Sequence, residues 1–239
     1  MRISVLTLFP ELFDRFFTTS IVGRAAERGI ITTDLVQIRD YAKDIHRHVD
    51  DTPFGGGAGM VMKCQPALDA LASVRTEDSH VILLSASGAP YTQKKAHELA
   101  AKTHLVFLCG HYEGVDERIA ERCDEQISIG DYVLTGGELG AMVIADSVIR
   151  LLPGVIREDS ICEESYENGL LEYPQYTQPA EYDGESVPQV LLSGHHENIR
   201  KWRLTQSLLR TREVRPDLFA AHKLTEEEEK LLDAADNEK

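Results

Sequence analysis

The chain has 239 residues, a formal net charge of −15, 42% hydrophobic residues and 27% charged residues. Its length suffices for one large domain or for a main domain with a smaller one, and its composition is that of a folded globular protein. The longest aliphatic run, residues 81–84, is far too short to span a bilayer, so we expect no membrane partner. The first residues reach Pro10 too early for a signal peptide, and four scattered cysteines indicate the reduced thiols of a cytoplasmic protein.

The negative charge is unevenly distributed. Residues 196–216 contain six Lys or Arg and two acidic residues, a local net charge of +4, whereas residues 226–239 contain seven acidic residues and two lysines, a local net charge of −5. An acidic tail therefore accounts for part of the global charge, and the basic segment keeps nucleic acid among the candidate partners.

The first two thirds of the chain alternate between strand-like and helix-like segments. Five hydrophobic runs predict strands at 3–9, 33–38, 81–86, 104–110 and 126–130. Helices are expected after Pro10, after Pro66, over 93–102, over 117–123 and over 139–152, where Pro153 and Gly154 end the pattern. This alternation predicts an α/β domain with a mostly parallel sheet over residues 1–156.

The pattern changes after residue 156. Residues 157–169 are acidic, polar and without periodicity, which is typical of a flexible linker. Residues 170–194 look extended, and from His195 onward the pattern is helical. Trp202 and Leu209 predict an apolar stripe on the first of these helices, so we expect a small helical domain over 170–239.

Two glycine-rich stretches, FGGGAGMVMK (54–63) and SIGDYVLTGGELG (128–140), invite a nucleotide-binding interpretation. A phosphate loop needs Gly-Lys-Ser/Thr at its end, but Gly59 is followed by Met60. A dinucleotide fingerprint that starts at Gly55 would need a glycine at the position that Met60 occupies. Neither motif is present, so the glycines indicate a close backbone approach to some other ligand, or simply tight turns.

Three loops are placed better for binding. The stretches at 83–88, 108–114 and 128–137 each follow a strand-like run, so in a parallel sheet they meet at the carboxyl ends of the strands. They offer backbone donors and acceptors but no cluster of positive charge. An uncharged or cationic adenosine derivative therefore fits these loops better than ATP does.

Other site chemistries are weaker. His46 and His48 with Asp50, or His195 with His196, lack the spacing of a zinc-binding helix, so we expect no metal site on them. Serine hydrolase chemistry has no support either, because no Gly-x-Ser-x-Gly nucleophile elbow occurs.

Several segments, taken in chain order, resemble the bacterial tRNA (guanine-N1)-methyltransferases, SPOUT-class enzymes that use S-adenosylmethionine. The segments are LTLFPELF (6–13), VDDTPFGGGAGMVMK (49–63), CGHYEGVDER (109–118), SIGDYVLTGGEL (128–139), LLPGV (151–155), GLLEYPQYT (169–177) and VLLSGHHENIRKWRLTQSL (190–208). The similarity extends over about residues 1–217, nearly the whole chain. It implies an α/β domain with a deep trefoil knot, a helical C-terminal domain that grips tRNA, and a homodimer.

The resemblance also implies residues for the cofactor. Those that would line the S-adenosylmethionine pocket are Leu84, Ser85, Gly110, Tyr112, Glu113, Gly114, Ser128, Ile129, Gly130, Asp131, Tyr132, Val133, Leu134, Gly136 and Gly137. The family associates an acidic residue at the position of Glu113 with magnesium, so Mg²⁺ is a second candidate cofactor.

The reaction that the resemblance implies is methyl transfer to N1 of the guanosine at tRNA position 37, 3′ of the anticodon. N1 carries a proton that a carboxylate can remove. An ungapped match assigns this role to Glu164 in the linker, although the family has aspartate at that position. Asp159 is the alternative. Arg150 matches the catalytic arginine of the family and would offset charge on guanine O6.

The tRNA would be held by two groups of residues. Those expected near the target guanosine are His46, Asp50, Gly57 and Gly59, and those expected at phosphates are Arg200, Lys201, Arg203, Arg210 and Arg212. The chain departs from the family at Gly140, where proline is usual, and at Gln178, where arginine is usual. Two alternatives remain open: another SPOUT enzyme that methylates ribose or ribosomal RNA, and an RNA-binding protein that has lost activity.

Overall fold

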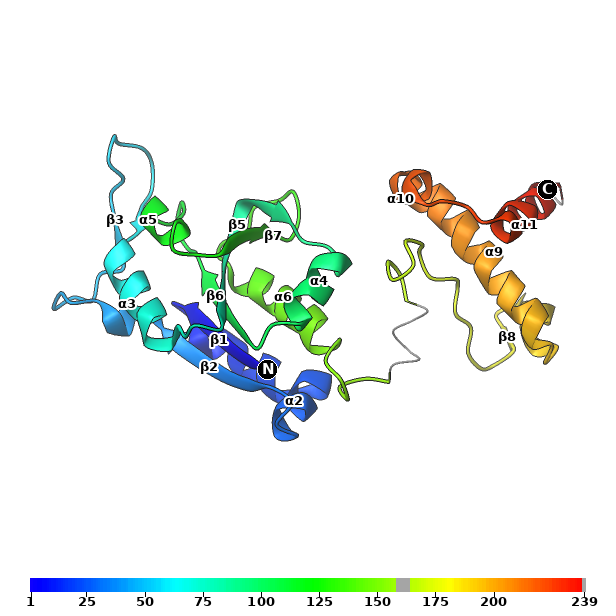
Figure 1. Cartoon of the computed structure of the whole chain (residues 1–239), viewed down its shortest axis with the longest axis horizontal. Coiled ribbons are helices and arrows are strands. Elements are labelled where there is room, and N and C mark those ends of the chain that lie inside the picture. The colour runs from blue at the N-terminus through cyan, green and yellow to red at the C-terminus, as the bar shows by residue number, and fades with distance from the viewer. Residues whose placement is uncertain (158–163, 238–239) are drawn as a thin grey trace. The chain divides into compact units, whose positions relative to one another are not determined.

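The computed structural model describes residues 1–157 and 164–237, which divide into two compact units, Met1–Arg157 and Glu158–Lys239 (Figure 1). The residue predicted as an alternative base, Asp159, lies outside the described residues. Within the described ranges no helix is both long and apolar enough to cross a membrane.

The first unit is built on a parallel sheet of five strands. These are β1 (Arg2–Thr7), β2 (Thr32–Gln37), β5 (Ser79–Pro90), β6 (His104–Cys109) and β7 (Glu125–Ser128). Their order is β2-β1-β6-β5-β7, and every neighbouring pair is parallel. The mostly parallel α/β sheet is thereby confirmed, with β5 running beyond its predicted end to Pro90.

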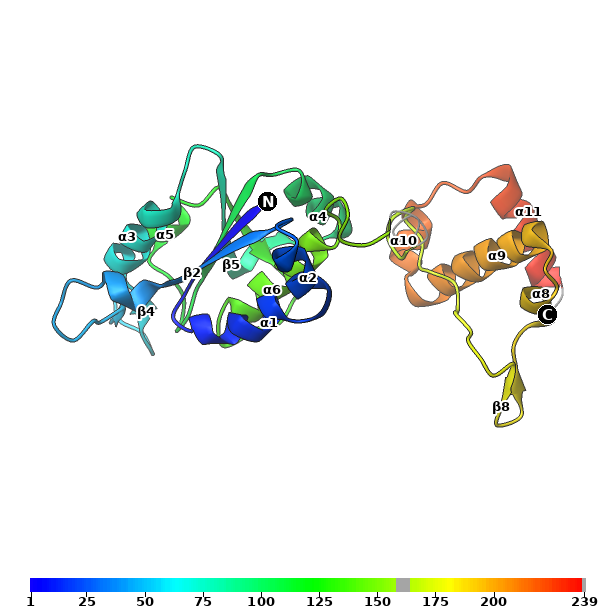
Figure 2. The same ribbon diagram turned by 90° about the horizontal axis from the view of Figure 1, so that it is seen from below.

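Helices cover both faces of this sheet (Figures 1 and 2). One face packs against α1 (Asp14–Thr18), α2 (Ser20–Glu27), α4 (Gln93–Ala100) and α6 (Glu138–Ile149). The other packs against α3 (Cys64–Val74) and α5 (Glu117–Ala120). The remaining elements are η1 (Pro10–Phe13), η2 (Ile38–Tyr41), β3 (Asp50–Asp51) and β4 (Val61–Met62). Alternate residues of each strand face the two layers, for example Ile82 and Leu83 of β5, as the period of two requires.

The start of α6 is fastened to β1 by a buried hydrogen bond. The Thr7 hydroxyl donates to Glu138 Oε1 at 2.7 Å and accepts from the Phe9 amide at 3.0 Å. Glu138 is the first residue of α6, where the helix dipole stabilises a negative charge. Burial raises the pKa of the neighbouring Cys109 thiol, and the charge of Glu138 adds to the effect.

Three chain segments meet at Gly137, the residue before α6. Its amide donates to the Gly110 carbonyl at 2.9 Å. A Cβ at Gly137 would lie 2.8 Å from Cys109 Cα and 2.9 Å from Leu84 Cβ, which is closer than real Cβ atoms approach. Leu84 of β5 and Cys109 at the end of β6 therefore lie against the beginning of α6, and only glycine fits at this position.

The second unit is mostly helical. It contains β8 (Glu181–Tyr182), β9 (Glu185–Ser186), α8 (Gln189–Leu192), α9 (His196–Val214), α10 (Pro216–Ala221) and α11 (Glu226–Asn237). Its core consists of Leu170, Leu208 and Leu232, from the segment before α9, from α9 and from α11. Of the predicted linker, residues 164–169 belong to this unit, and the Tyr166 amide donates to the Leu170 carbonyl at 2.8 Å.

The stripe predicted on α9 is shifted by one residue. The side chains buried on this helix are Ser207, Leu208 and Thr211, whereas Trp202 and Leu209 are only half-buried. The difference arises because Leu170 and Leu232 pack against Leu208, and neither contact can be read from the periodicity of α9 alone.

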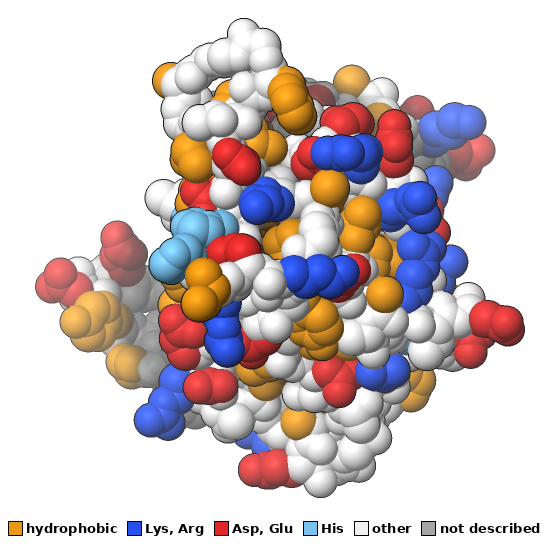
Figure 3. Space-filling model, turned by 90° about the vertical axis from the view of Figure 1, so that its left-hand side faces the viewer, with side chains coloured by type: hydrophobic (Ala, Val, Ile, Leu, Met, Phe, Trp, Pro, Cys, Tyr) orange, Lys and Arg blue, Asp and Glu red, His pale blue; other side chains and the backbone are white. Residues whose placement is uncertain are grey.

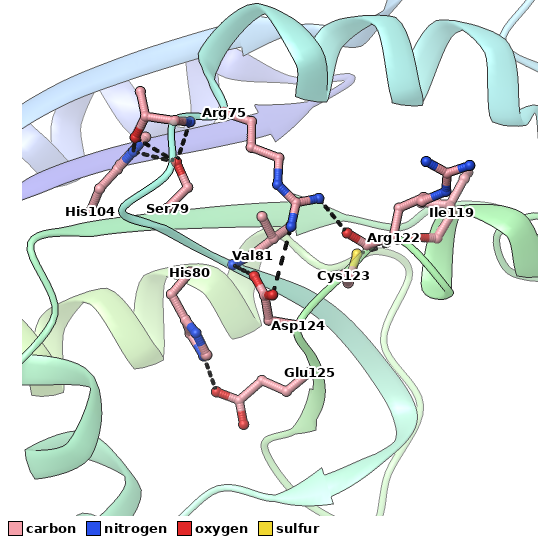
Figure 4. Close-up of polar contacts among 11 residues, drawn as sticks. Arg75, Ser79, His80, Val81, His104, Ile119, Arg122, Cys123, Asp124 and Glu125 are labelled. Carbon is pink, nitrogen blue, oxygen red and sulfur yellow. Dashed lines mark hydrogen bonds and ion pairs between the residues drawn. The ribbon is translucent and has the colours of Figure 1, made fainter.

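A buried histidine joins the amino-terminal ends of three strands. His104 of β6 is 3% exposed, and its Nε2 lies 2.9 Å from Ser4 Oγ. Its Nδ1 lies 2.8 Å from Ser79 Oγ (Figure 4). Ser4 donates its hydroxyl proton to Asp34, so its oxygen is left to accept from Nε2. Burial lowers the pKa of His104, the charge of Arg2 lowers it further, and that of Asp34 opposes both. The folded environment therefore favours the neutral imidazole.

This histidine predicts a pH dependence of stability. Below about pH 6.5, the pKa of an unperturbed histidine, the unfolded chain binds a proton that the folded chain does not. We therefore expect the free energy of unfolding to fall as the pH is lowered from about 7 to about 5. His104→Gln should make this dependence shallower in urea unfolding at several pH values, and identical slopes would contradict the assignment.

Thr7→Val tests the bond that fastens α6. The substitution keeps the shape of the side chain but leaves a buried oxygen of Glu138 without this donor. We expect the free energy of unfolding to fall by about 1–3 kcal/mol, the cost of a buried acceptor left unsatisfied. Urea unfolding followed by circular dichroism measures the loss. Thr103→Val, at an exposed position, is the matched control, and an equal loss in both variants would refute the role of Thr7.

Candidate functional site

A cavity of about 310 Å³ opens at the carboxyl ends of β5, β6 and β7. Its walls come from residues 84–87 of β5, where the register with β7 shifts, and from the ends of β6 and β7 with the loops that follow them, including residues 110–115 and 128–137. Because all the strands are parallel, their last residues lie at one edge of the sheet, the usual place for a ligand in such folds.

The residues predicted to bind the cofactor gather around this cavity, with one exception. The lining includes Leu84, Ser85, Gly110, Tyr112, Glu113, Gly114, Ser128, Ile129, Gly130, Tyr132, Val133, Leu134, Gly136 and Gly137. Asp131 does not line it. That these side chains hold a cofactor stays a prediction, but the structure brings them together.

Other lining residues were not predicted; some lie in the same loops, whereas Leu83 and Ile127 lie in strands and Gly140 lies in α6. They are Leu83, Ala86, Ser87, His111, Val115, Ile127, Thr135 and Gly140. At Gly140, where the family has proline, a Cβ would approach Leu84 Cδ1 to 3.1 Å. The missing side chain therefore lets Leu84, in the wall of the cavity, pack closely against α6.

Backbone forms much of the wall because side chains would not fit. Loop residues His111 and Gly136 form an antiparallel bridge, and a Cβ at Gly136 would collide with the Glu138 carboxylate and lie 2.8 Å from His111 Nδ1. Tyr112 has a φ of 64°, an unusual value for a residue other than glycine. Such strained positions are concentrated at binding sites.

The charge of the lining is distinctive. Among the residues that the structure describes, the lining contains no Lys or Arg, and Glu113 is its single carboxylate. Glu113 packs against Gly59, and its amide donates to the Met60 carbonyl at 3.0 Å. The glycine-rich stretch at 54–63 is therefore joined to the loop that carries Glu113, and the cavity has no cation with which to bind a polyphosphate.

Tyr112 connects the cavity to the segment expected near the target guanosine. It interacts with Asp50 of β3 and with Arg39, and its backbone bridges to Val61 of β4. Burial raises the pKa of Tyr112, and the charge of Asp50 raises it further. Asp50 therefore lies beside Tyr112, one of the residues that line the cavity.

The glycine-rich stretch forms an exposed loop beside this connection. Gly55, Gly56, Gly57 and Gly59 all have positive φ values, between 77° and 135°. Phe54 at its start is fully exposed, and His46 is exposed on the preceding segment with its ring 5.5 Å from that of His48. Figure 3 shows a face of the first unit on which Lys and Arg are interspersed with Asp and Glu.

The two predicted catalytic residues belong to different units. Arg150 caps the C-terminus of α6 in the first unit and is half-buried. Glu164 is the first described residue of the second unit, is half-buried, and its carbonyl accepts from the Glu167 amide at 3.4 Å. Both side chains have interaction partners, so neither is a free surface charge.

The basic side chains of α9 are already engaged within the second unit. Arg203 stacks on the ring of Tyr173 at 4.7 Å, and Arg210 donates to the Glu172 carbonyl at 3.1 Å. Three others face carboxylates, since Arg200 binds Glu197 and Glu227, Lys201 lies 3.6 Å from Glu197, and Arg212 lies 2.7 Å from Asp236. The pairing with Arg200 lowers the pKa of Glu197 to about 2. Gln178 is exposed in the same unit.

A magnesium site built by the protein alone does not fit the cavity. Mg²⁺ needs several oxygen ligands in octahedral geometry, and Glu113 is the only carboxylate in the lining. Over the parts of the chain that the structure describes, no group of three His, Cys, Asp or Glu side chains is placed to hold a metal ion.

The chain matches known proteins over most of its length. A family model described as tRNA (Guanine-1)-methyltransferase TrmD matches residues 1–221. A protein of Ruminiclostridium cellulolyticum named tRNA (guanine-N(1)-)-methyltransferase is 58% identical over 224 residues, 92% of this chain and 96% of the relative. A protein of the same name from Clostridium botulinum (strain Langeland) is 56% identical over 97% of this chain and 97% of the relative. One from Clostridium perfringens (strain ATCC 13124) is 53% identical over 97% of this chain and 99% of the relative.

A match of this extent and identity goes far beyond a shared fold. The family model also covers the loops that build the cavity at the carboxyl ends of β5, β6 and β7. The chain therefore belongs to the tRNA (guanine-1)-methyltransferase family.

Proposed function

We propose that the chain transfers the methyl group of S-adenosylmethionine to N1 of the guanosine at position 37 of tRNA, 3′ of the anticodon, in the cytoplasm. The observation that carries this proposal is the cavity at the sheet edge, which is lined by glycine backbone and contains no Lys or Arg. An adenosine with a positive sulfonium suits such a cavity, whereas a polyphosphate does not. Membership of the family favours the methyl donor among ligands of this kind.

The proposed cofactor site uses backbone rather than charged side chains. S-adenosylmethionine, when bound, supplies an electrophilic methyl group. Backbone amides and carbonyls of residues 128–137 would pair with the edges of adenine, and Gly136 and Gly137 allow the close approach that this needs. Glu113, the single carboxylate of the lining, complements the positive charge of the cofactor.

The proposed base is Glu164. N1 of guanine is protonated at neutral pH, so its lone pair becomes available only when a carboxylate accepts that proton. As the proton leaves, negative charge accumulates on guanine O6. Arg150 is the cation that we propose to stabilise this charge. Holding N1 in line with the methyl group then supplies much of the rate enhancement.

We further propose that the first unit forms a trefoil knot and a homodimer. The knot is supported by Gly137, where the chain that leaves β7 returns to touch the ends of both β5 and β6. The homodimer is supported by Leu139 and Val143, one turn apart on α6 and 57% and 47% exposed, together with Leu12 of η1 at 53%. Exposed aliphatic side chains on one helix face are suited to a second copy of the chain.

The tRNA would contact both units. We propose that His46, Asp50, Gly57 and Gly59 approach the target guanosine, since Asp50 adjoins Tyr112 of the cavity. The basic residues of α9 would contact phosphates, which predicts binding that weakens as salt rises. A protein that only binds RNA remains the alternative if no methyl transfer is found.

The function is tested directly by methyl transfer. The full chain, incubated with methyl-labelled S-adenosylmethionine and unmodified tRNA, should incorporate one methyl group at N1 of guanosine 37. A tRNA with adenosine at this position is the control and should stay unlabelled. Label in ribose or in ribosomal RNA would favour another SPOUT activity, and absence of label would leave only RNA binding.

Glu164→Gln tests the base. The amide cannot accept the N1 proton, so we expect turnover to fall by about 10²–10⁴-fold, the usual contribution of a general base. The affinity for S-adenosylmethionine, measured by calorimetry, should stay within about twofold of the parent because the cofactor loops are untouched. Glu167→Gln is the neighbouring control and should keep its turnover. If Asp159→Asn loses activity and Glu164→Gln does not, the aspartate is the base.

A further inference from the structure

The C-terminal helix α11 carries a dense negative charge against the basic helix α9. Its first four residues, 226–229, are all glutamates, and Asp233 and Asp236 follow. The match to the family model ends at residue 221, so α11 lies beyond the matched residues. The proposed phosphate contacts on α9 give no reason for an acidic neighbour.

Two ion pairs join the helices near both ends of α11. Arg200 Nη1 donates to Glu227 Oε2 at 3.3 Å, and Arg212 lies 2.9 Å and 2.7 Å from the two oxygens of Asp236. Both arginines are among those proposed to contact tRNA phosphates. The carboxylates thus occupy guanidinium donors that a phosphate would need, and at Arg200 they share this role with Glu197 of α9.

Apolar packing, more than these ion pairs, keeps α11 in place. The ion pairs are exposed, and pairs of this kind contribute little to stability because water and salt screen them. Leu232 of α11, in contrast, is 6% exposed and packs with Leu170 and Leu208. The carboxylates are therefore held beside α9 even when their own attraction is screened by salt.

A tethered carboxylate competes with any phosphate for the same guanidinium. Because the competitor is intramolecular, its effective concentration is high and does not depend on how much RNA is present. An RNA that contacts α9 only through its phosphates must displace the carboxylate with no compensating contact. A tRNA that is also held at its target guanosine can leave the two ion pairs in place and still bind, so it does not meet this cost in full.

We propose that Glu227 and Asp236 determine specificity by masking Arg200 and Arg212 from RNA that lacks the other contacts of the substrate. This inference rests on the proposed tRNA binding by α9. The carboxylates lower the affinity for unrelated RNA more than the affinity for substrate tRNA, so the acidic helix increases discrimination between them.

The test is the double variant Glu227→Gln with Asp236→Asn, which removes two charges and keeps the side-chain shapes. Its control is Glu181→Gln with Glu185→Gln, on the exposed hairpin β8–β9 of the same unit, which changes the net charge equally. Filter binding measures the affinity for substrate tRNA and for an unrelated RNA of the same length, at several salt concentrations.

In the double variant we expect the unrelated RNA to bind about 3–10-fold tighter at low salt. The slope of log affinity against log salt should steepen by about 0.7–0.9 for each arginine that gains a phosphate. The catalytic efficiency on substrate tRNA should change less than twofold. The single variant Glu227→Gln, expected to give part of the steepening, provides a second measurement if the double variant is poorly folded.

The proposal is overturned if the double variant and the hairpin control shift the affinity for unrelated RNA equally, because bulk charge would then suffice. It is also overturned if substrate tRNA and unrelated RNA gain equally in the double variant. Failure of the proposed function is recognised separately, in the parent chain, by absence of methyl transfer and of salt-dependent tRNA binding.

Discussion

The contact of three chain segments at Gly137 is the constraint on which the rest of the site depends. The ends of β5 and β6 and the start of α6 approach so closely there that no side chain fits between them. The hydrogen bond from Gly137 to the Gly110 carbonyl joins two of the loops, and Thr7 holds Glu138 at the next position. Glycine backbone therefore forms part of the cavity wall, beside side chains such as Tyr112 and Leu134, in positions set by the sheet.

A wall of this kind selects its ligand by what it lacks. Backbone groups can pair with the edges of a base, but without Lys or Arg they cannot neutralise phosphates. One carboxylate, Glu113, leaves a weak preference for positive charge. A cationic adenosine derivative satisfies both conditions, which is why the failure of SIGDYVLTGGELG to match a phosphate loop is informative about its ligand.

The sequence predicts the parts of the structure that depend on local pattern. The hydrophobic run at 81–86 predicts a strand, and loops that follow such runs can be expected at one edge of a parallel sheet. Features that depend on distant residues are not predicted. Ser4 and His104, which form a hydrogen bond, are 100 positions apart. The buried stripe on α9 is shifted because Leu170 and Leu232 pack against the face that carries Leu208.

The net charge of −15 illustrates the same limit. A sum over the chain says little about RNA binding, and even a local count of +4 over residues 196–216 overstates the positive charge that an RNA would meet. Arg200 and Arg212 are paired with residues 27 and 24 positions further along the chain, which no window on α9 includes. The charge available to a phosphate is set by tertiary contacts. Because its arginines are paired in this way, charge alone would give the chain only a modest affinity for tRNA. In the proposed function, recognition then depends on the contacts that surround the target guanosine.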